Sequence, residues 1–319
     1  MNVTDNRRKD SEPFFSFVIA TYNPKWKQLK TTLDSILRQT YTDYEIIFSD
    51  DGSSDNLYPK LKQYLKHRGF SNYAMLENSV NQGTVRNFLV GGSFCRGKYI
   101  KDFGPGDMLY SPETLGKMVE FVQSTGYRLI AGYPIGFTET SNGRKKKVAF
   151  PHPFDIGAYQ TGNEKRIIKN LLLYTDTVCG ANLCFEKNLF IDYLKKIEGR
   201  VIYAEDLIQI MAALDGDRVQ FMDDYMIFYE VDSGSSTKKD SPFKQLLKKD
   251  VEEFYKLLSE EYPDNKIIKK RLKLSKYYEI DNIYLRTLVR SCSNPSLYIY
   301  MLRHYMGILT KKYNPYSSN

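Results

Sequence analysis

The residues of this 319-residue chain that are best suited to chemistry are carboxylates that follow short apolar runs. Asp50 and Asp51 follow the run YEIIFS, Asp107 closes the stretch KDFGPGD, and Glu205 and Asp206 are adjacent. Carboxylates can ligate a divalent cation, accept hydrogen bonds from a base or a ribose, or remove a proton from a hydroxyl group. They form a site only if the elements that carry them converge.

The stretch KDFGPGD also contains the tripeptide DFG, residues 102–104, which carries magnesium in protein kinases. A kinase needs in addition a glycine-rich nucleotide loop upstream and a His-Arg-Asp triplet. The chain has neither, so the sequence excludes a protein kinase.

Strands and helices alternate along the first part of the chain. The apolar runs 14–20 (FFSFVIA) and 44–49 (YEIIFS) predict buried strands, and each is followed by an amphipathic helix, from Trp26 onward and over 57–65. This alternation predicts a parallel sheet whose faces are covered by helices. Ligands of such sheets bind at the carboxyl ends of the strands. The stretches TYNP, DDGSSD and GPGD all fall at predicted strand ends, so we expect one common site.

The elements that follow extend this α/β pattern. We predict one large domain over 14–237, preceded by a flexible N-terminus (1–13) and followed by a helical region (238–319), with the flexible exit at SGSST, 233–237. The pattern predicts helices over 113–124, 163–175 and 186–198, another from near Glu205, and strands over 127–132 and 219–230.

Some of the candidate residues have a second interpretation. Asp50 and Asp51 can bind a nucleoside, but they can equally cap the helix that follows. Arg86 lies one turn into a predicted helix, where its guanidinium and the helix dipole would both attract phosphate. Taken alone, the position of Arg86 favours the exposed start of a surface helix.

The ordered set of motifs resembles the family-2 inverting glycosyltransferases with a GT-A fold, an α/β fold with a Rossmann-like, mostly parallel sheet. The resemblance covers roughly residues 14–237. It rests on FVIATYNP (17–24), SILRQT (35–40), YEIIFSDDGSSD (44–55), NQG with Arg86 and Asn87, GKYIK (97–101) leading to Asp107, and AED (204–206).

The resemblance implies a role for each matching position. Asp206 matches the general base, Asp107 the aspartate that ligates Mg²⁺ or Mn²⁺, and GAN (180–182) the loop beside donor sugar and acceptor. Four positions match residues that contact the nucleotide: Thr21 and Tyr22 in the pocket wall, Asp51 facing the base, and Arg86 on base or phosphate.

Gly106 is the main departure, because the family commonly has an acidic residue there that touches the ribose or the metal. One carboxylate with two diphosphate oxygens and waters is still adequate for Mg²⁺, so we expect metal dependence with weak affinity. Asp102 is a spare carboxylate five residues upstream of Asp107. Its side chain has two interpretations: it contacts the metal, or it caps the end of the strand.

The family's reaction is direct displacement at the anomeric carbon, with a carboxylate removing the acceptor's proton. The resemblance implies a nucleoside diphosphate-sugar donor, most often UDP with dTDP as an alternative, and a glycan or lipid-linked acceptor of bacterial surface polysaccharides. Two other classes stay open: a nucleotidyltransferase, although no glycine-rich phosphate loop follows the first strand, and a sugar-nucleotide-binding or scaffold protein without activity.

Composition narrows the partners further. Only four cysteines and three histidines occur, without metal spacing, which disfavours a zinc site. No apolar run approaches the roughly 20 residues of a membrane span, and the polar N-terminus lacks a signal-peptide core, so we expect a cytoplasmic protein. No recognition motif supports nucleic acid binding.

The net charge of +8 is concentrated near the C-terminus. Residues 242–319 hold 15 Lys/Arg against 8 Asp/Glu and many tyrosines. Basic side chains and tyrosines suit the inner surface of a membrane, which predicts peripheral attachment. The alternative is that these helices pack on the main domain or form a homo-oligomer.

Overall fold

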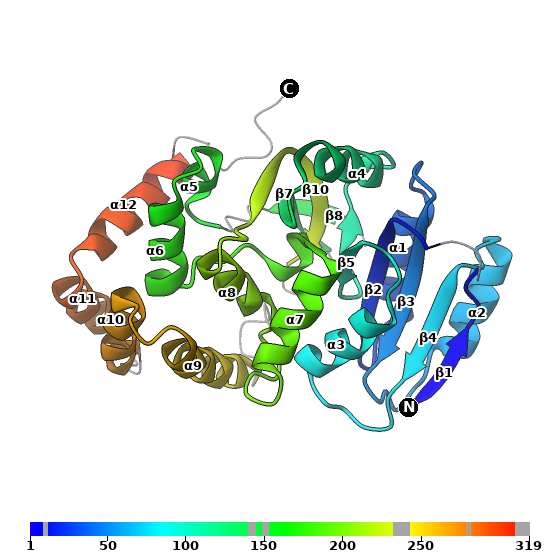
Figure 1. Ribbon diagram of the computed structural model, residues 1–319, viewed down its shortest axis with the longest axis horizontal. Coiled ribbons are helices and arrows are strands. Elements are labelled where there is room, and N and C mark those ends of the chain that lie inside the picture. Colours follow the sequence, from blue (N-terminus) through cyan, green and yellow to red (C-terminus); the bar gives the residue numbers. More distant parts are fainter. Residues whose placement is uncertain are drawn as a thin grey trace.

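The computed structural model describes residues 1–8, 12–139, 145–148, 153–231, 243–278, 280 and 282–309. Within these residues, ten strands form one mixed sheet in the order β1-β4-β3-β2-β5-β9-β7-β10-β6, with β8 paired to β7 (Figure 1). The strands are β1 Asn2–Asp5, β2 Phe15–Thr21, β3 Tyr44–Asp50, β4 Tyr73–Glu77, β5 Tyr99–Phe103, β6 Met108–Leu109, β7 Leu129–Glu139, β8 Lys145–Val148, β9 Leu183–Glu186 and β10 Gln220–Glu230.

The helices cover both faces of this sheet. They are α1 Trp26–Leu37, α2 Tyr58–His67, α3 Thr84–Phe94, α4 Thr114–Thr125, α5 Ile156–Gln160, α6 Glu164–Tyr174, α7 Lys187–Ile197, α8 Ile208–Leu214, α9 Phe243–Glu261, α10 Lys266–Ser275, α11 Ile283–Ser293 and α12 Ser296–Leu309, with short 3₁₀ turns η1 Gly180–Asn182, η2 Glu205–Leu207 and η3 Lys276–Tyr278.

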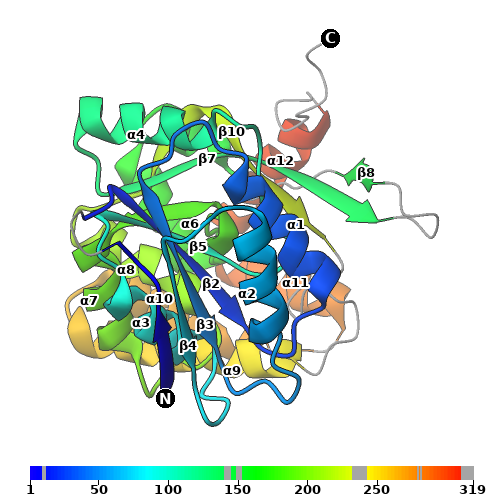
Figure 2. The same cartoon turned by 90° about the vertical axis from the view of Figure 1, so that its right-hand side faces the viewer.

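Strands β4, β3, β2 and β5 are parallel neighbours, as the alternating pattern predicted. Their carboxyl ends therefore meet at one edge. Two apolar cores enclose the sheet: α1, α2 and α4 supply one, whereas α3, α6, α7 and α8 supply the other. Figure 2 shows α1 and α2 together on the first face. The mixed α/β fold with C-terminal helices confirms the predicted fold class.

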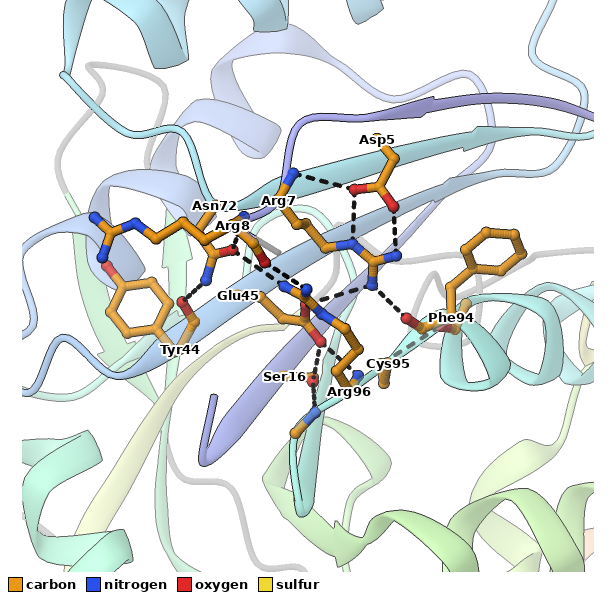
Figure 3. A network of polar contacts seen from close by, with 12 residues as sticks. Asp5, Arg7, Arg8, Ser16, Tyr44, Glu45, Asn72, Phe94, Cys95 and Arg96 are labelled. Carbon is orange, nitrogen blue, oxygen red and sulfur yellow. Dashed lines mark hydrogen bonds and ion pairs between the residues drawn. The ribbon is translucent and has the colours of Figure 1, made fainter. Parts of the chain in front are cut away.

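The N-terminal segment differs from its prediction. Residues 2–5, expected to be flexible, form β1, which pairs antiparallel with β4. The reason is a polar network beyond β1 (Figure 3), where the Arg7 guanidinium binds Asp5 and donates to the carbonyl oxygen of Phe94 at 2.5 Å. Arg7 also reaches Glu45, a fully buried carboxylate that Arg96 binds from the other side. These contacts anchor the arm to the sheet.

The C-terminal helices differ among themselves in packing. Helices α9 and α10 contribute Phe254, Leu258 and Ile268 to the core that also contains α7 and α8. Helices α11 and α12 instead expose several large apolar side chains. In the part of the chain that the structure describes, no helix has the length and apolar character needed to cross a membrane. The predicted exit at 233–237 and the domain boundary at 237/238 lie outside the described residues.

Candidate active site

A cleft of about 710 Å³ opens at the carboxyl ends of β2, β3 and β5. Its wall brings together carboxylates that are far apart in sequence. The structure places five of the predicted site residues in this wall, together with the spare carboxylate Asp102: Thr21, Tyr22, Asp51, Asp107 and Asp206.

The end of β2 and the loop after β3 form one wall through hydrogen bonds. The Thr21 hydroxyl donates to Asp50 Oδ2 at 2.8 Å, and Asp50 also accepts the Ser53 hydroxyl and amide. Asn23, in the left-handed region with φ of 45°, accepts the Ser54 N–H through its side chain. Asp50 thus shapes the loop, whereas Tyr22 stays 55% exposed with its ring available in the cleft wall.

Asp51 lines the cleft and also orders the segment that enters α3. Its two carboxylate oxygens accept the N–H groups of Gln82 at 2.9 Å and Gly83 at 2.8 Å. Burial is the main cause that raises the pKa of Asp51. A carboxylate has about four acceptor positions, so a base can still bind here. The nucleoside interpretation is compatible with this position. The cap interpretation is not, because α2, the helix that follows, has Leu57 as its N-cap and no side-chain hydrogen bond there.

Arg86 and Gly106 do not join this wall. Arg86, although in α3, forms an ion pair with Glu198 and lines a separate hollow beside Ile202. Its guanidinium points away from the cleft because α3 turns that side toward α7. Gly106 is buried behind the wall, with its N–H donating to the Thr32 hydroxyl at 2.8 Å.

Asp107 is held in the turn that follows β5. Its Oδ1 accepts the backbone N–H of Glu230, the last residue of β10, at 3.2 Å. Burial raises the pKa of Asp107 to about 7, with smaller contributions from the nearby charges of Glu230 and Asp102. A bound cation would stabilise the ionised form of such a carboxylate.

Glu205 and Asp206 both line the cleft. They lie in the 3₁₀ turn η2, directly before α8. Burial and the charge of Asp102 raise the pKa of Asp206 to about 6. Burial and the charge of Asp206 raise the pKa of Glu205 well above its usual range.

Gly180 permits the close approach of the GAN loop to this pair. A Cβ on Gly180 would lie 3.2 Å from the Asp206 Cβ. Gln209, fully buried in α8, holds the two segments together by binding the N–H and C=O of Val178 and the carbonyl oxygen of Asp206. Sequence reasoning missed Gln209, since nothing in its local pattern signals these contacts.

A second missed residue, Asp250, comes from α9. Its Oδ2 accepts three backbone N–H groups directly before the acidic pair, from Ile202 at 3.2 Å, Tyr203 at 2.5 Å and Ala204 at 3.0 Å. Phe243, at the start of α9, also lines the cleft and packs edge-on against Tyr203. Helix α9 is therefore part of the site.

Lys101 and Asp102 form a buried pair below the cleft. The Lys101 ammonium donates to the carbonyl oxygens of Asp102 and Ala181, both at 2.7 Å, so it supports the GAN loop from below. Burial lowers the pKa of Lys101 and raises that of Asp102. Asp102 Oδ1 is buried without a hydrogen-bond partner and lies 4.0 Å from the ammonium.

The residues present fit Mg²⁺ or Mn²⁺ as a partner of a phosphorylated ligand. Among the described residues, no three acidic, histidine or cysteine side chains converge as a complete metal cage. Asp107 and Glu230, however, lie together in the cleft wall. Mg²⁺ is usually bound by one or two carboxylates plus substrate phosphates and waters, so this donor set suffices.

The family of the chain follows from a sequence comparison. The model of "Glycosyl transferase family 2" matches residues 16–194, which is more than half of the chain. The chain belongs to this family. This confirms the resemblance noted from the motifs.

Curated relatives match over shorter stretches. The chain is 29% identical over 123 residues to "Putative glycosyltransferase EpsE" of Bacillus subtilis, covering 39% of this chain and 43% of that protein. It is 26% identical over 174 residues to an uncharacterized glycosyltransferase of Haemophilus influenzae, covering 54% and 48%. The chain thus spans less than half the length of these relatives.

Solved structures share the fold. TarS of S. aureus in complex with UDP-GlcNAc has a TM-score of 0.54 at 17% identity, covering 82% of this chain and 71% of that one. Mannosyltransferase PcManGT from Pyrobaculum calidifontis in complex with GDP-Man and Mn²⁺ has a TM-score of 0.54 at 13% identity, covering 96% and 83%. At these identities the comparison establishes the GT-A fold alone.

Proposed function

We propose that this protein is an inverting glycosyltransferase that moves a sugar from a nucleoside diphosphate donor to a hydroxyl group of a glycan or lipid-linked acceptor. The observation that carries the proposal is the gathering of Asp51, Asp107 and Asp206 in one cleft of a family-2 chain. The raised pKa of Asp206, about 6, supports a catalytic cleft over one that only binds a ligand, because perturbed pKa values cluster at functional sites.

The donor would lie along the strand ends. Tyr22 offers an aromatic face and Asp51 an acceptor for the base, while the diphosphate reaches Asp107. Mg²⁺ or Mn²⁺ at Asp107 would offset the charge that develops on the leaving diphosphate. UDP is the donor nucleotide we propose first, because the family most often uses it.

Asp206 would act as the general base. It accepts the proton of the acceptor hydroxyl while that oxygen forms a bond to the anomeric carbon, and the bond from this carbon to the diphosphate breaks. Attack from the side opposite the leaving group inverts the configuration. A positioned base typically contributes about 10²–10⁴-fold to the rate. Gln209 donates to the carbonyl oxygen of Asp206, and Lys101 donates to that of Ala181. These two hydrogen bonds would hold the base and the GAN loop in fixed positions relative to each other.

The experiment is a screen of sugar nucleotides by thermal shift, with and without Mn²⁺, followed by assay of transfer or donor hydrolysis. A ligand that binds only the native state raises the melting temperature by mass action. We expect a UDP-sugar to stabilise the protein in the presence of metal and to be consumed. Release of pyrophosphate from a nucleoside triphosphate would instead indicate a nucleotidyltransferase, and binding without turnover a scaffold protein.

For the acceptor, we propose a surface polysaccharide or its lipid-linked precursor, used at the inner face of the cell membrane. The support is the basic charge of residues 242–319 and the apolar side chains that α11 and α12 expose. The same surface would serve in a homo-oligomer, and the vesicle experiment described below separates these two uses.

A further inference from the structure

Glu230, which no sequence motif singled out, lies beside Asp107, where the sequence left the proposed cation site with a single carboxylate. It ends β10 and lines the cleft. Its backbone N–H binds Asp107 Oδ1 at 3.2 Å, and its Oε2 accepts the side-chain amide of Gln28 at 2.8 Å. The two acidic residues, 123 positions apart in sequence, are thus held side by side.

The geometry at Gly106 connects this position to the missing acidic residue. A Cβ built on Gly106 would lie 2.3 Å from Glu230 Oε2 and 3.6 Å from Gln28 Nε2. The Glu230 carboxylate therefore fills the space in which a side chain of residue 106 would begin. Gly106 also has a φ of +118°, which side chains rarely adopt, so an acidic residue there would be strained as well as crowded.

Asp102 provides a separate sign that this cleft receives a ligand. Its side chain is only 6% exposed, and its Oδ1 has no hydrogen-bond partner. A buried carboxylate oxygen that has no hydrogen bond, only the Lys101 ammonium 4.0 Å away, is costly unless a ligand, its hydration waters or a cation satisfies it. Asp102 lines the same cleft as Asp107 and Glu230.

We propose that Glu230 is a ligand of the divalent cation, and that it supplies from β10 the carboxylate that Gly106 cannot supply from the turn. Gln28 is the positioning residue that orients it. The proposal rests on the proposed function, because the donor's diphosphate would complete the coordination. Two carboxylates at one cation also predict tighter metal binding than the single carboxylate expected from the sequence.

The test measures Mn²⁺ binding to the full chain by electron paramagnetic resonance and calorimetry, with MnCl₂ alone and with UDP. Glu230→Gln should weaken Mn²⁺ binding about tenfold or more, the range seen when groups that support a metal are removed. The variant keeps an oxygen for Gln28 and the backbone N–H for Asp107, so we expect an unchanged fold by circular dichroism. Asp107→Asn should weaken binding at least as much.

Two further variants sharpen the result. Gln28→Ala keeps the Glu230 carboxylate but removes the hydrogen bond that orients it. Its Mn²⁺ affinity should therefore lie between that of the wild type and that of Glu230→Gln. Asp223→Asn is the matched control, because Asp223 is an exposed carboxylate of the same strand and is not among the residues that line the cleft. Wild-type Mn²⁺ affinity in Glu230→Gln, or no Mn²⁺ binding by the wild type under either condition, would overturn the proposal. Donor turnover by the wild type is scored separately, so failure of Glu230 as a ligand is distinguishable from failure of the transferase assignment.

Discussion

Asp206 is half-buried, and desolvation together with the charge of Asp102 raises its pKa to about 6. A general base must be ionised to act, so we expect the rate of transfer to fall as the pH drops below about 6. Asp206→Asn should lower turnover about 10²-fold or more at pH 8, with the donor KM nearly unchanged. Initial rates between pH 5 and 9 provide the measurement.

The matched control for this variant is Asp192→Asn, which changes an exposed carboxylate of α7. Loss of donor binding in proportion to the rate would make Asp206 a binding or folding residue instead. The pH dependence of stability has the opposite sign to that of activity. Since burial raises the pKa of the folded form from 3.8 to about 6, ionisation of Asp206 lowers the stability as the pH rises through this interval.

At the residue scale, the sequence predicted residues in two ways. Asp51 and Asp107 were predicted from their place at strand ends, and Asp206 from the family resemblance; all three line the cleft. Glu230, Gln209 and Asp250 could not be predicted, because their contacts join segments that only the folded chain brings together. Arg86 was predicted as a site residue but lies outside the cleft, because its position in the helix does not tell which side of α3 faces the cleft.

Glu45 gives a prediction about stability at the same scale. It is fully buried at the start of β3, where it binds the Ser16 hydroxyl at 2.8 Å, the Arg96 N–H at 2.6 Å and two guanidinium groups (Figure 3). Glu45→Gln would leave both guanidinium groups without this charge. We expect a loss of about 2–3 kcal/mol in the free energy of unfolding, below the usual cost of breaking a buried pair because Arg7 keeps Asp5.

Urea denaturation measures this loss. Glu120→Gln, an exposed position of α4, is the control and should unfold at the wild-type midpoint. Equal midpoints for both variants would mean that the network in Figure 3 does not stabilise the fold.

At the element scale, Asp250 makes helix α9 a support of the catalytic turn. Asp250→Ala would leave three N–H groups before Glu205 without their acceptor, one buried and two partly buried. The cost is about 1–3 kcal/mol for the buried group and less for the two that water can reach. We expect turnover to fall at least tenfold while UDP binding, which depends on β2 and β3, is retained. Steady-state kinetics and UDP calorimetry together test this.

Glu252→Ala, an exposed position of the same helix, controls for changes in helix propensity. Wild-type turnover in Asp250→Ala would show that the turn keeps its shape without α9. A parallel loss of UDP binding would point to general unfolding.

The spacing of apolar residues predicted most of the helices and strands, because strands such as β2 and helices such as α1 carry strong, uninterrupted apolar patterns. The short strands β1 and β9 did not. Strand β1 is polar and exposed, so its pairing with β4 leaves no apolar signature. Strand β9 has only four residues, between the 3₁₀ turn η1 and helix α7. Whether these two segments form strands is decided by the neighbouring strands with which they pair, and not by their own composition.

At the scale of the whole molecule, the sheet and the C-terminal helices form a single continuous body, with β1 at one end and α11 at the other (Figure 1). Helices α9 and α10 are packed into the core, so removing residues 238–319 would delete core side chains such as Phe254 and Leu258 and uncover the apolar side chains that pack against them. Point variants in α11 and α12 are therefore the appropriate test of the membrane hypothesis.

The exposed apolar side chains of α11 and α12 are spaced for helical faces. Leu285 and Leu288 are three residues apart in α11, and Tyr298 and Leu302 are four apart in α12; they are 51%, 54%, 53% and 60% exposed. Arg286, Arg290 and Arg303 lie on the same two helices. Apolar side chains beside cations favour the interface of an anionic bilayer, where each basic residue adds about 1 kcal/mol.

We expect the full chain to co-sediment with vesicles that contain phosphatidylserine at low salt, and to be released as salt is raised, because the Debye length shortens. The double variant Leu285→Ser, Leu302→Ser should lose most of this binding, since it removes two side chains that would enter the apolar layer. Val80→Ser, at a site 61% exposed on another part of the surface, should sediment like the wild type. Equal sedimentation of all three proteins, or of none, would remove the membrane hypothesis. A shift from dimer to monomer in the double variant, measured by analytical ultracentrifugation without vesicles, would then assign these helices to self-association.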